Sequence, residues 1–145
     1  MGMPADPIVE RALAVTRSLR ALASQLMERA YAKRDAGELS LDEFLVMEQR
    51  HQRILNQANV AIYDATAHLA SIAEEFQKVE EATKELDKLQ TTLKTVTEVL
   101  NISAQLLLAA SALALMFFDP NPGTVAASAS AIFEVGRTIR DAAAR

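Results

Sequence analysis

The chain has 145 residues with 15 basic and 19 acidic side chains, so its net charge is -4, and half of its residues are hydrophobic. This length suits one domain of residues 1–145, and the composition excludes disordered and collagen-like chains. The absence of cysteine excludes disulfides, thiolate metal sites and cysteine nucleophiles, and the mildly acidic balance gives no footprint for nucleic acid.

The N-terminal twenty residues contain no uninterrupted apolar region of the signal-peptide type, because charged side chains such as Asp6, Glu10 and Arg11 interrupt it. We therefore expect a protein that is made in soluble form without a cleaved signal peptide. Its location would be cytoplasmic, membrane-associated, or outside the cell by a leaderless route.

Residues 7–35 are predicted to form the first helix. Asp6 and Pro7 resemble an N-cap followed by proline at the first helical position, and Gly37 can take the left-handed conformation that ends a helix. Apolar residues recur between these signals at alternating spacings of four and three, which indicates one apolar helical stripe. They are Ile8, Ala12, Val15, Leu19, Leu22 and Leu26.

Residues 41–98 are predicted to form one long amphipathic helix or a helix pair. Ser40 and Glu43 have the capping-box spacing, and no glycine or proline occurs from Glu38 to Asp119. Apolar residues follow a heptad-like lattice that predicts a packed helix seam. The seam consists of Leu55, Ile62, Leu69, Ile72, Phe76, Val79, Leu86 and Leu93.

An unbroken helix across this glycine-free region would exceed about 120 Å in length. A compact chain of this size has a radius of gyration near 15 Å, so the region either folds back or forms a rod. The residues that disfavour a helix most are Thr91-Thr92 and Asn101-Ile102-Ser103, and these are the expected breaks.

Residues 99–143 are predicted to form an apolar helical hairpin. Val99 to Phe118 carries no charge and, as a helix, would span about 30 Å, the thickness of a bilayer's hydrocarbon core. The sequence Asp119-Pro120-Asn121-Pro122-Gly123 is a strong turn signal, after which Thr124 can cap a final helix. Asp119 is the only charged residue from Val99 to Phe133.

The second arm of this hairpin begins with a block of small residues, Ala126 to Ala131, which lets another helix approach closely. Glu134 follows and, in a membrane, would have to be neutral, paired or near the headgroups. Lys94, Arg137 and Arg140 place the basic residues at one end of the hairpin, as expected for entry from one side of a bilayer.

About 100 residues remain to cover this hairpin, so we expect lipid, a second copy or another helical protein to cover it. Internal burial is the third alternative, and burial of Leu106, Leu113 and Phe117 within the chain would count against the other two. The expected membrane or partner interface consists of Leu100, Leu106, Leu107, Leu113, Leu115, Phe117, Phe118, Val125, Ile132 and Phe133.

No constellation of residues predicts catalysis, a cofactor, a metal or a small-molecule substrate. Glu48 and His51 have the spacing of half a di-iron site, but the other histidine, His68, lacks the matching glutamate and would lie about 25 Å away on one helix. His51 is better explained as a polar layer in a helix seam. Arg11, Arg17 and Arg20 form a small basic patch that we interpret as a solvated face.

The sequence thus predicts an all-α protein: an elongated bundle of three to four helices with one very long helix and an apolar C-terminal hairpin. The arrangement resembles that of α-helical pore-forming toxins and secreted translocators in architecture only, since no residue motif of these families is present. We expect a non-catalytic protein that acts through helix assembly and membrane interaction. The alternative is a soluble homo-oligomeric adaptor or scaffold that uses the hairpin as a protein–protein interface.

Overall fold

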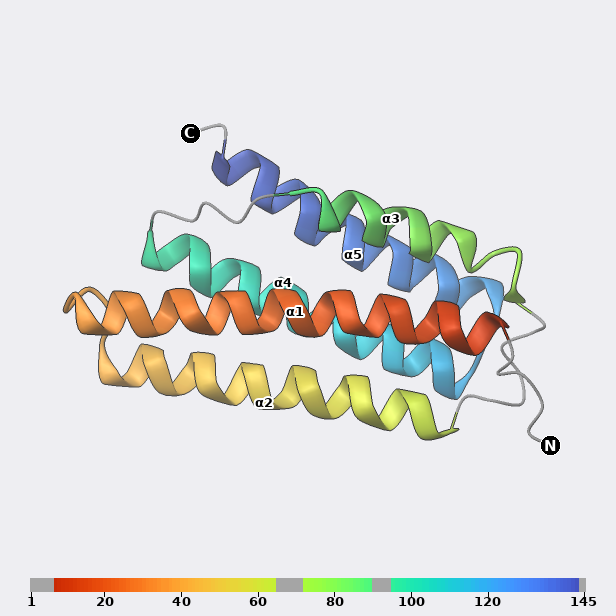
Figure 1. Ribbon diagram of the computed structural model, residues 1–145, viewed down its shortest axis with the longest axis horizontal. Coiled ribbons are helices and arrows are strands. Elements are labelled where there is room, and N and C mark those ends of the chain that lie inside the picture. The colour runs from red at the N-terminus through yellow and green to blue at the C-terminus, as the bar shows by residue number, and fades with distance from the viewer. Residues whose placement is uncertain (1–6, 65–71, 90–94, 144–145) are drawn as a thin grey trace.

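The computed structural model describes residues 7–64, 72–89 and 95–143, and these ranges form an all-helical bundle without strands. Five helices lie within them: α1 (Pro7–Asp35), α2 (Leu41–Asp64), α3 (Gln77–Asp87), α4 (Val96–Phe118) and α5 (Pro122–Ala143). The helices run roughly along one axis of an elongated molecule (Figure 1).

The helices form a closed ring in the order α1, α2, α4, α5 and α3, with α1 also contacting α4 across the bundle. Figure 1 shows α1 antiparallel to α2, and α4 antiparallel to α5, while α2 and α4 run in the same direction. Three helices, α1, α2 and α5, contact α4, which is the most apolar of the five described helices.

The first helix spans Pro7–Asp35, the range that the sequence indicated. Gly37 has a φ of 74° and ends it in the left-handed conformation. The Glu38 amide donates to the Lys33 carbonyl oxygen at 2.9 Å, which satisfies one of the carbonyls left free at the helix end.

The prediction of one very long helix and of three to four helices is wrong. The region from residue 41 to 98 contains α2, α3 and the first turn of α4. Ser40 and Glu43 do form the expected capping box, with bonds of 3.0 and 3.1 Å. Thr95 caps α4, because the Glu98 amide donates to the Thr95 hydroxyl at 3.1 Å and that hydroxyl donates to Glu98 Oε1 at 3.0 Å.

Of the two expected breaks, Asn101-Ile102-Ser103 lies inside α4 and is therefore not a break. The other, Thr91-Thr92, lies outside the described residues. The Ser103 hydroxyl donates to the Leu100 carbonyl oxygen at 2.7 Å, so this polar group is satisfied within its own helix turn.

The core is one apolar cluster to which all five helices contribute. Among the residues of the predicted seam, Ile72, Phe76, Val79 and Leu86 are buried and Leu55 is half-buried. These positions belong to α2, to α3 and to the turn before α3, so the seam residues come from separate elements. The side chains of Ile62, Leu69 and Leu93 lie outside the described residues.

Candidate functional site

The turn between α4 and α5 is fixed by Asn121. The Thr124 amide donates to the Asn121 side-chain oxygen at 3.0 Å, and the Asn121 amide donates to the Thr124 hydroxyl at 3.1 Å. Asn121 therefore caps α5, with Pro122 as its first residue, so the expectation that Thr124 is the cap is wrong. Thr124 supplies the reciprocal bond instead.

The block of small residues brings α5 against the backbone of α4. Ser128 is fully buried, and its hydroxyl donates to the Ala112 carbonyl oxygen at 2.9 Å. A hydroxyl can reach a carbonyl that already accepts a helical bond only where two helices approach closely. The close approach takes place within this chain, between the two arms of the hairpin.

The inner face of α4 is covered by its own chain. Leu106, Leu113 and Phe117 have exposed fractions of 0%, 1% and 2%. The expectation that too few residues remain to cover the hairpin is therefore wrong for this face, because α1, α2 and α5 together enclose it. These three residues cannot contact a membrane or a partner unless the bundle opens.

The outer face of α4 is uncovered. Leu108, Leu115 and Phe118 have exposed fractions of 67%, 55% and 77%. Leu108 and Leu115 are seven residues apart and lie almost on one line along the helix. Half-buried Ala104, Ser111 and Ala112 occupy the same face, and no charged residue occurs between Val99 and Phe118. We call these six residues the α4 outer face.

The other residues of the expected interface divide between core and surface. Val125 and Ile132 are buried on α5, and Leu100 and Leu107 are half-buried on the side of α4. Phe133 is exposed but belongs to another part of the surface, described below. Leu108 is the most exposed leucine in the part of the chain that the structure describes, and it was absent from the expected set. The helical period of 3.6 residues, which places residues 108 and 115 on the same face, could have indicated it.

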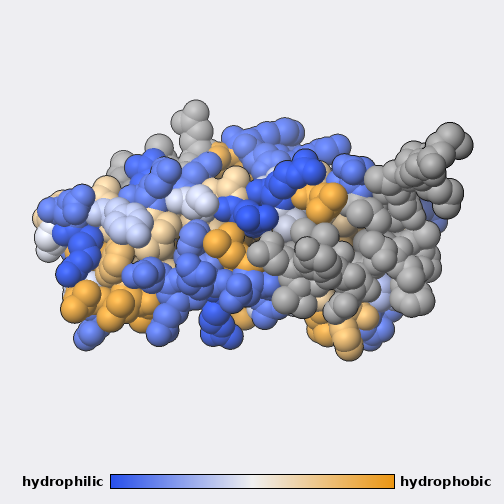
Figure 2. Space-filling view, turned by 60° about the horizontal axis from the view of Figure 1, so that its bottom comes forward, coloured by the Kyte–Doolittle hydropathy of each residue, from blue (hydrophilic) through white to orange (hydrophobic). Residues whose placement is uncertain are grey.

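Other exposed hydrophobic residues lie near the connection between α1 and α2, away from the α4 outer face. They are Tyr31, Leu41, Leu45 and Val46. The Tyr31 ring of α1 packs edge to face against the Phe44 ring of α2, with ring centroids 5.2 Å apart. Tyr31 therefore makes a contact across the connection between α1 and α2. On the face shown in Figure 2, hydrophobic residues form separate groups between hydrophilic ones.

One flank of α4 is fixed by Arg50 of α2. Its Nη1 donates to the Leu100 carbonyl oxygen and to the Ser103 hydroxyl, both at 2.9 Å. A guanidinium that binds backbone and hydroxyl oxygens links the two parallel helices without needing a carboxylate. The α4 outer face is therefore held in a fixed orientation relative to α2.

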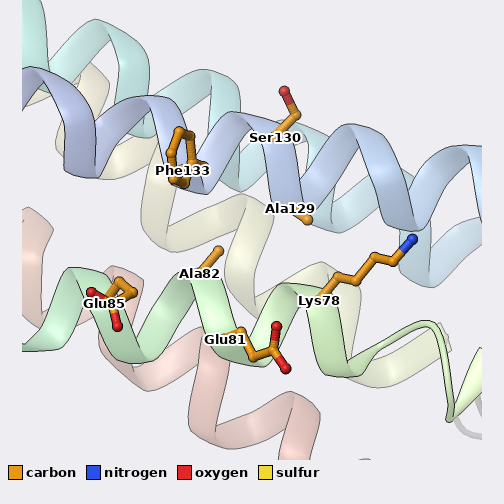
Figure 3. Close-up of a pocket in the computed structure, with 7 residues that line it drawn as sticks. All are labelled: Lys78, Glu81, Ala82, Glu85, Ala129, Ser130 and Phe133. Carbon is orange, nitrogen blue, oxygen red and sulfur yellow. The ribbon is translucent and has the colours of Figure 1, made fainter.

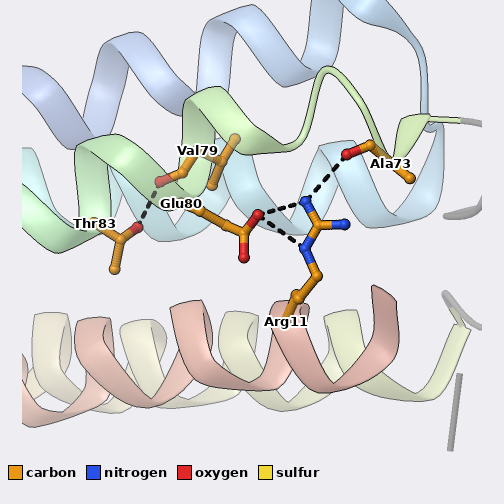
Figure 4. A network of polar contacts seen from close by, with 5 residues as sticks. All are labelled: Arg11, Ala73, Val79, Glu80 and Thr83. Carbon is orange, nitrogen blue, oxygen red and sulfur yellow. Dashed lines mark hydrogen bonds and ion pairs between the residues drawn. The ribbon is translucent and has the colours of Figure 1, made fainter. Parts of the chain in front are cut away.

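A polar cluster joins α1 to α3 (Figure 4). Arg11 forms an ion pair with Glu80, its Nε donates to Glu80 Oε1 at 2.8 Å, and its Nη2 donates to the Ala73 carbonyl oxygen at 3.1 Å. The guanidinium also lies 5.5 Å from the centroid of the Phe76 ring. The hydrogen bond that Arg11 donates to the Glu80 carboxylate raises the pKa of Arg11 above its ordinary value. Arg11 thus has a structural role rather than that of a solvated face.

We expect Glu80→Gln to lower the free energy of unfolding by about 1 kcal/mol, because it removes the charge from a pair whose side chains are only 29% and 23% exposed. Glu85→Gln on the same helix is the control, since Glu85 and its partner Lys88 are both exposed to solvent. This change should lower the free energy of unfolding by only a few tenths of a kcal/mol. Urea denaturation of both variants measures the difference, and equal stabilities would show that the Arg11 pair contributes nothing specific.

A shallow groove of about 410 Å³ runs between α3 and α5. Figure 3 shows its lining, which comprises Lys78, Glu81, Ala82 and Glu85 from α3 and Ala129, Ser130 and Phe133 from α5. The Arg140 guanidinium lies 5.5 Å from the centroid of the Phe133 ring. Phe133 therefore belongs to this groove and does not extend the α4 outer face.

Glu48 and His51, the residues with di-iron spacing, do not converge with further ligands. Glu48 is exposed on α2, and His51 is partly buried with an Nε2 that has no hydrogen-bond partner. His68 lies outside the described residues. Among the residues that the structure describes, no three histidine, aspartate or glutamate side chains are placed to hold a metal ion.

Comparison with known proteins gives no relative: no family model, no curated protein and no solved structure matches the chain. Within the described residues, α4 is the one helix long and apolar enough to cross a membrane, a property that buried core helices share.

Proposed function

We propose that the protein is non-catalytic and acts by association, with the α4 outer face as its protein–protein interface. The observation that carries this proposal is the combined exposure of Leu108, Leu115 and Phe118 on one uncharged helix face. Leu108 and Leu115 are one heptad apart, which is the spacing at which apolar side chains pack against another helix. Apolar surface grouped in this way, rather than scattered singly, marks interaction sites.

Because the flanks of α4 are held by Arg50 on one side and Ser128 on the other, the outer face is presented as a rigid surface. A rigid surface favours binding, since little conformational freedom is lost on association. A stable bundle that carries a preformed apolar surface, the α4 outer face, is suited to an adaptor or scaffold role.

A purified protein allows a direct test by light scattering over a range of micromolar concentrations, without detergent. We expect association that is lost in the variant Leu108→Glu/Leu115→Glu and retained in Leu41→Glu/Leu45→Glu. The control changes two exposed leucines on α2, so it introduces the same charges elsewhere on the surface. Association that survives the α4 variant, or a wild type that stays monomeric, would contradict the proposal.

Membrane insertion of the α4–α5 hairpin is a second candidate, supported by the composition of α4. The helix has 23 residues with a mean hydropathy of 1.9 over its most apolar stretch, and its one ionisable residue, Glu98, lies in the first turn. Insertion would require the bundle to open, because Leu106 and Leu113 must leave the core. Flotation with vesicles of phosphatidylcholine and phosphatidylglycerol distinguishes this function from association in solution.

A further inference from the structure

The α4 outer face has a pattern of large and small side chains that suits a second copy of itself in the opposite direction. Along the helix, small Ser111 and Ala112 lie midway between the large Leu108 and Leu115. If two copies meet face to face about a two-fold axis near Ser111 and Ala112, Leu108 of each copy lies opposite Leu115 of the other. The small residues at the axis let the helices approach closely.

The remaining residues of the face fit the same arrangement. Phe118 of one copy lies within one residue of the level of Ala104 of the other, about 1.5 Å along the axis, so the most exposed aromatic ring in the described residues meets a small side chain. By helix geometry, both residues lie on the same side of the Leu108–Leu115 line as Ser103, which Arg50 of α2 contacts. A two-fold axis across the helices places the two α2 sides together. Large side chains thus meet small ones at each end of the contact, as close packing requires.

Charge distinguishes the two directions. Asp119 follows Phe118 at the end of the face and is exposed. In a parallel pair the two Asp119 carboxylates would lie at the same level, where like charges repel. In the antiparallel pair they are about 22 Å apart along the helix axis, well beyond a Debye length at physiological salt.

From these observations we infer that the chain forms a two-fold dimer through antiparallel packing of α4 against α4 of a second copy. The inference rests on the proposed association function and specifies its partner and its register. Both contacting surfaces are the same patch, as a two-fold interface requires.

The lack of cysteine in the chain allows a disulfide test of the register. Leu108→Cys is mixed with an affinity-tagged Leu115→Cys, and the mixture is exposed to a mild oxidant. We expect the mixed disulfide to exceed either like disulfide by about tenfold, because only sulfurs whose Cα atoms lie within about 7 Å can bond. Leu41→Cys mixed with tagged Leu45→Cys is the control for random collision, since both residues are exposed on α2.

Each outcome decides between the inference and the function on which it rests. Predominance of the two like disulfides would overturn the antiparallel register and leave association through α4 intact. A wild type that is monomeric by light scattering would overturn the second copy as partner. If such a monomer binds vesicles and loses this binding in Leu108→Glu/Leu115→Glu, α4 acts on membranes instead.

Discussion

Leu113→Glu is expected to unfold the protein, whereas Leu115→Glu, two positions further along α4, should leave it folded. Leu113 is 1% exposed in the core, and Leu115 is 55% exposed on the outer face. A carboxylate at position 113 would be buried without a partner, which costs several kcal/mol. Since a domain of this size is stable by only about 5–15 kcal/mol, that cost is a large fraction of the total.

Circular dichroism and urea denaturation measure this contrast. Alanine variants provide a graded version: Leu113→Ala should cost about 3 kcal/mol through the cavity it leaves, and Leu115→Ala less than about 0.5 kcal/mol. If both glutamate variants fold equally well, the inner face of α4 is not packed as described. The contrast is also a folding control for the association experiments, because it shows which leucines of α4 can be changed without loss of the fold.

Local helix signals in the sequence predicted local structure well. Pro7, Gly37 and the Ser40–Glu43 pair act through bonds within a few residues, and the structure places each of them at a helix end. The Thr95–Glu98 pair has the same capping-box spacing and could have indicated the start of α4 in the same way. The resulting all-helical bundle follows from such signals together with apolar periodicity.

The number of helices could not be predicted because the heptad-like seam continues across a helix end. Ile72, Phe76 and Val79 keep the seam spacing, although Ile72 precedes α3 and Val79 lies within it. No side chain caps α3 at Phe76, so this start carried no capping signal. Residues from different helices can point into one core at the same spacing, and periodicity alone does not distinguish them from one rod.

The sequence indicated the segment that carries the candidate interface, but not which side chains of that segment are exposed. Composition identified α4 as the unusual segment, but only packing decides which of its faces is covered. Leu106 and Leu108 are both leucines of the same uncharged run, yet Leu106 is fully buried and Leu108 is 67% exposed. Their separation depends on α1, α2 and α5, which lie far from α4 in the sequence or across a turn. Such long-range cover is not encoded in the composition of the segment itself.

The contact between α4 and α5 gives the second large effect: we expect Ser128→Leu to lower the free energy of unfolding by about 2–4 kcal/mol. The leucine removes the hydrogen bond to the Ala112 carbonyl, worth about 1 kcal/mol, and places extra volume where the helices touch. Ser130→Leu is the matched control, because the same change at an exposed position of α5 should alter stability by a few tenths of a kcal/mol.

Ser128→Ala separates the two causes, since it removes the hydrogen bond and adds no volume. We expect it to cost about 1 kcal/mol, so that most of the loss in Ser128→Leu comes from steric separation of the helices. If urea denaturation gave Ser128→Leu the stability of Ser130→Leu, α5 would not approach α4 closely at this point. The hairpin would then be free to open at little cost, and insertion of α4 into a bilayer would become the better account of its apolar face.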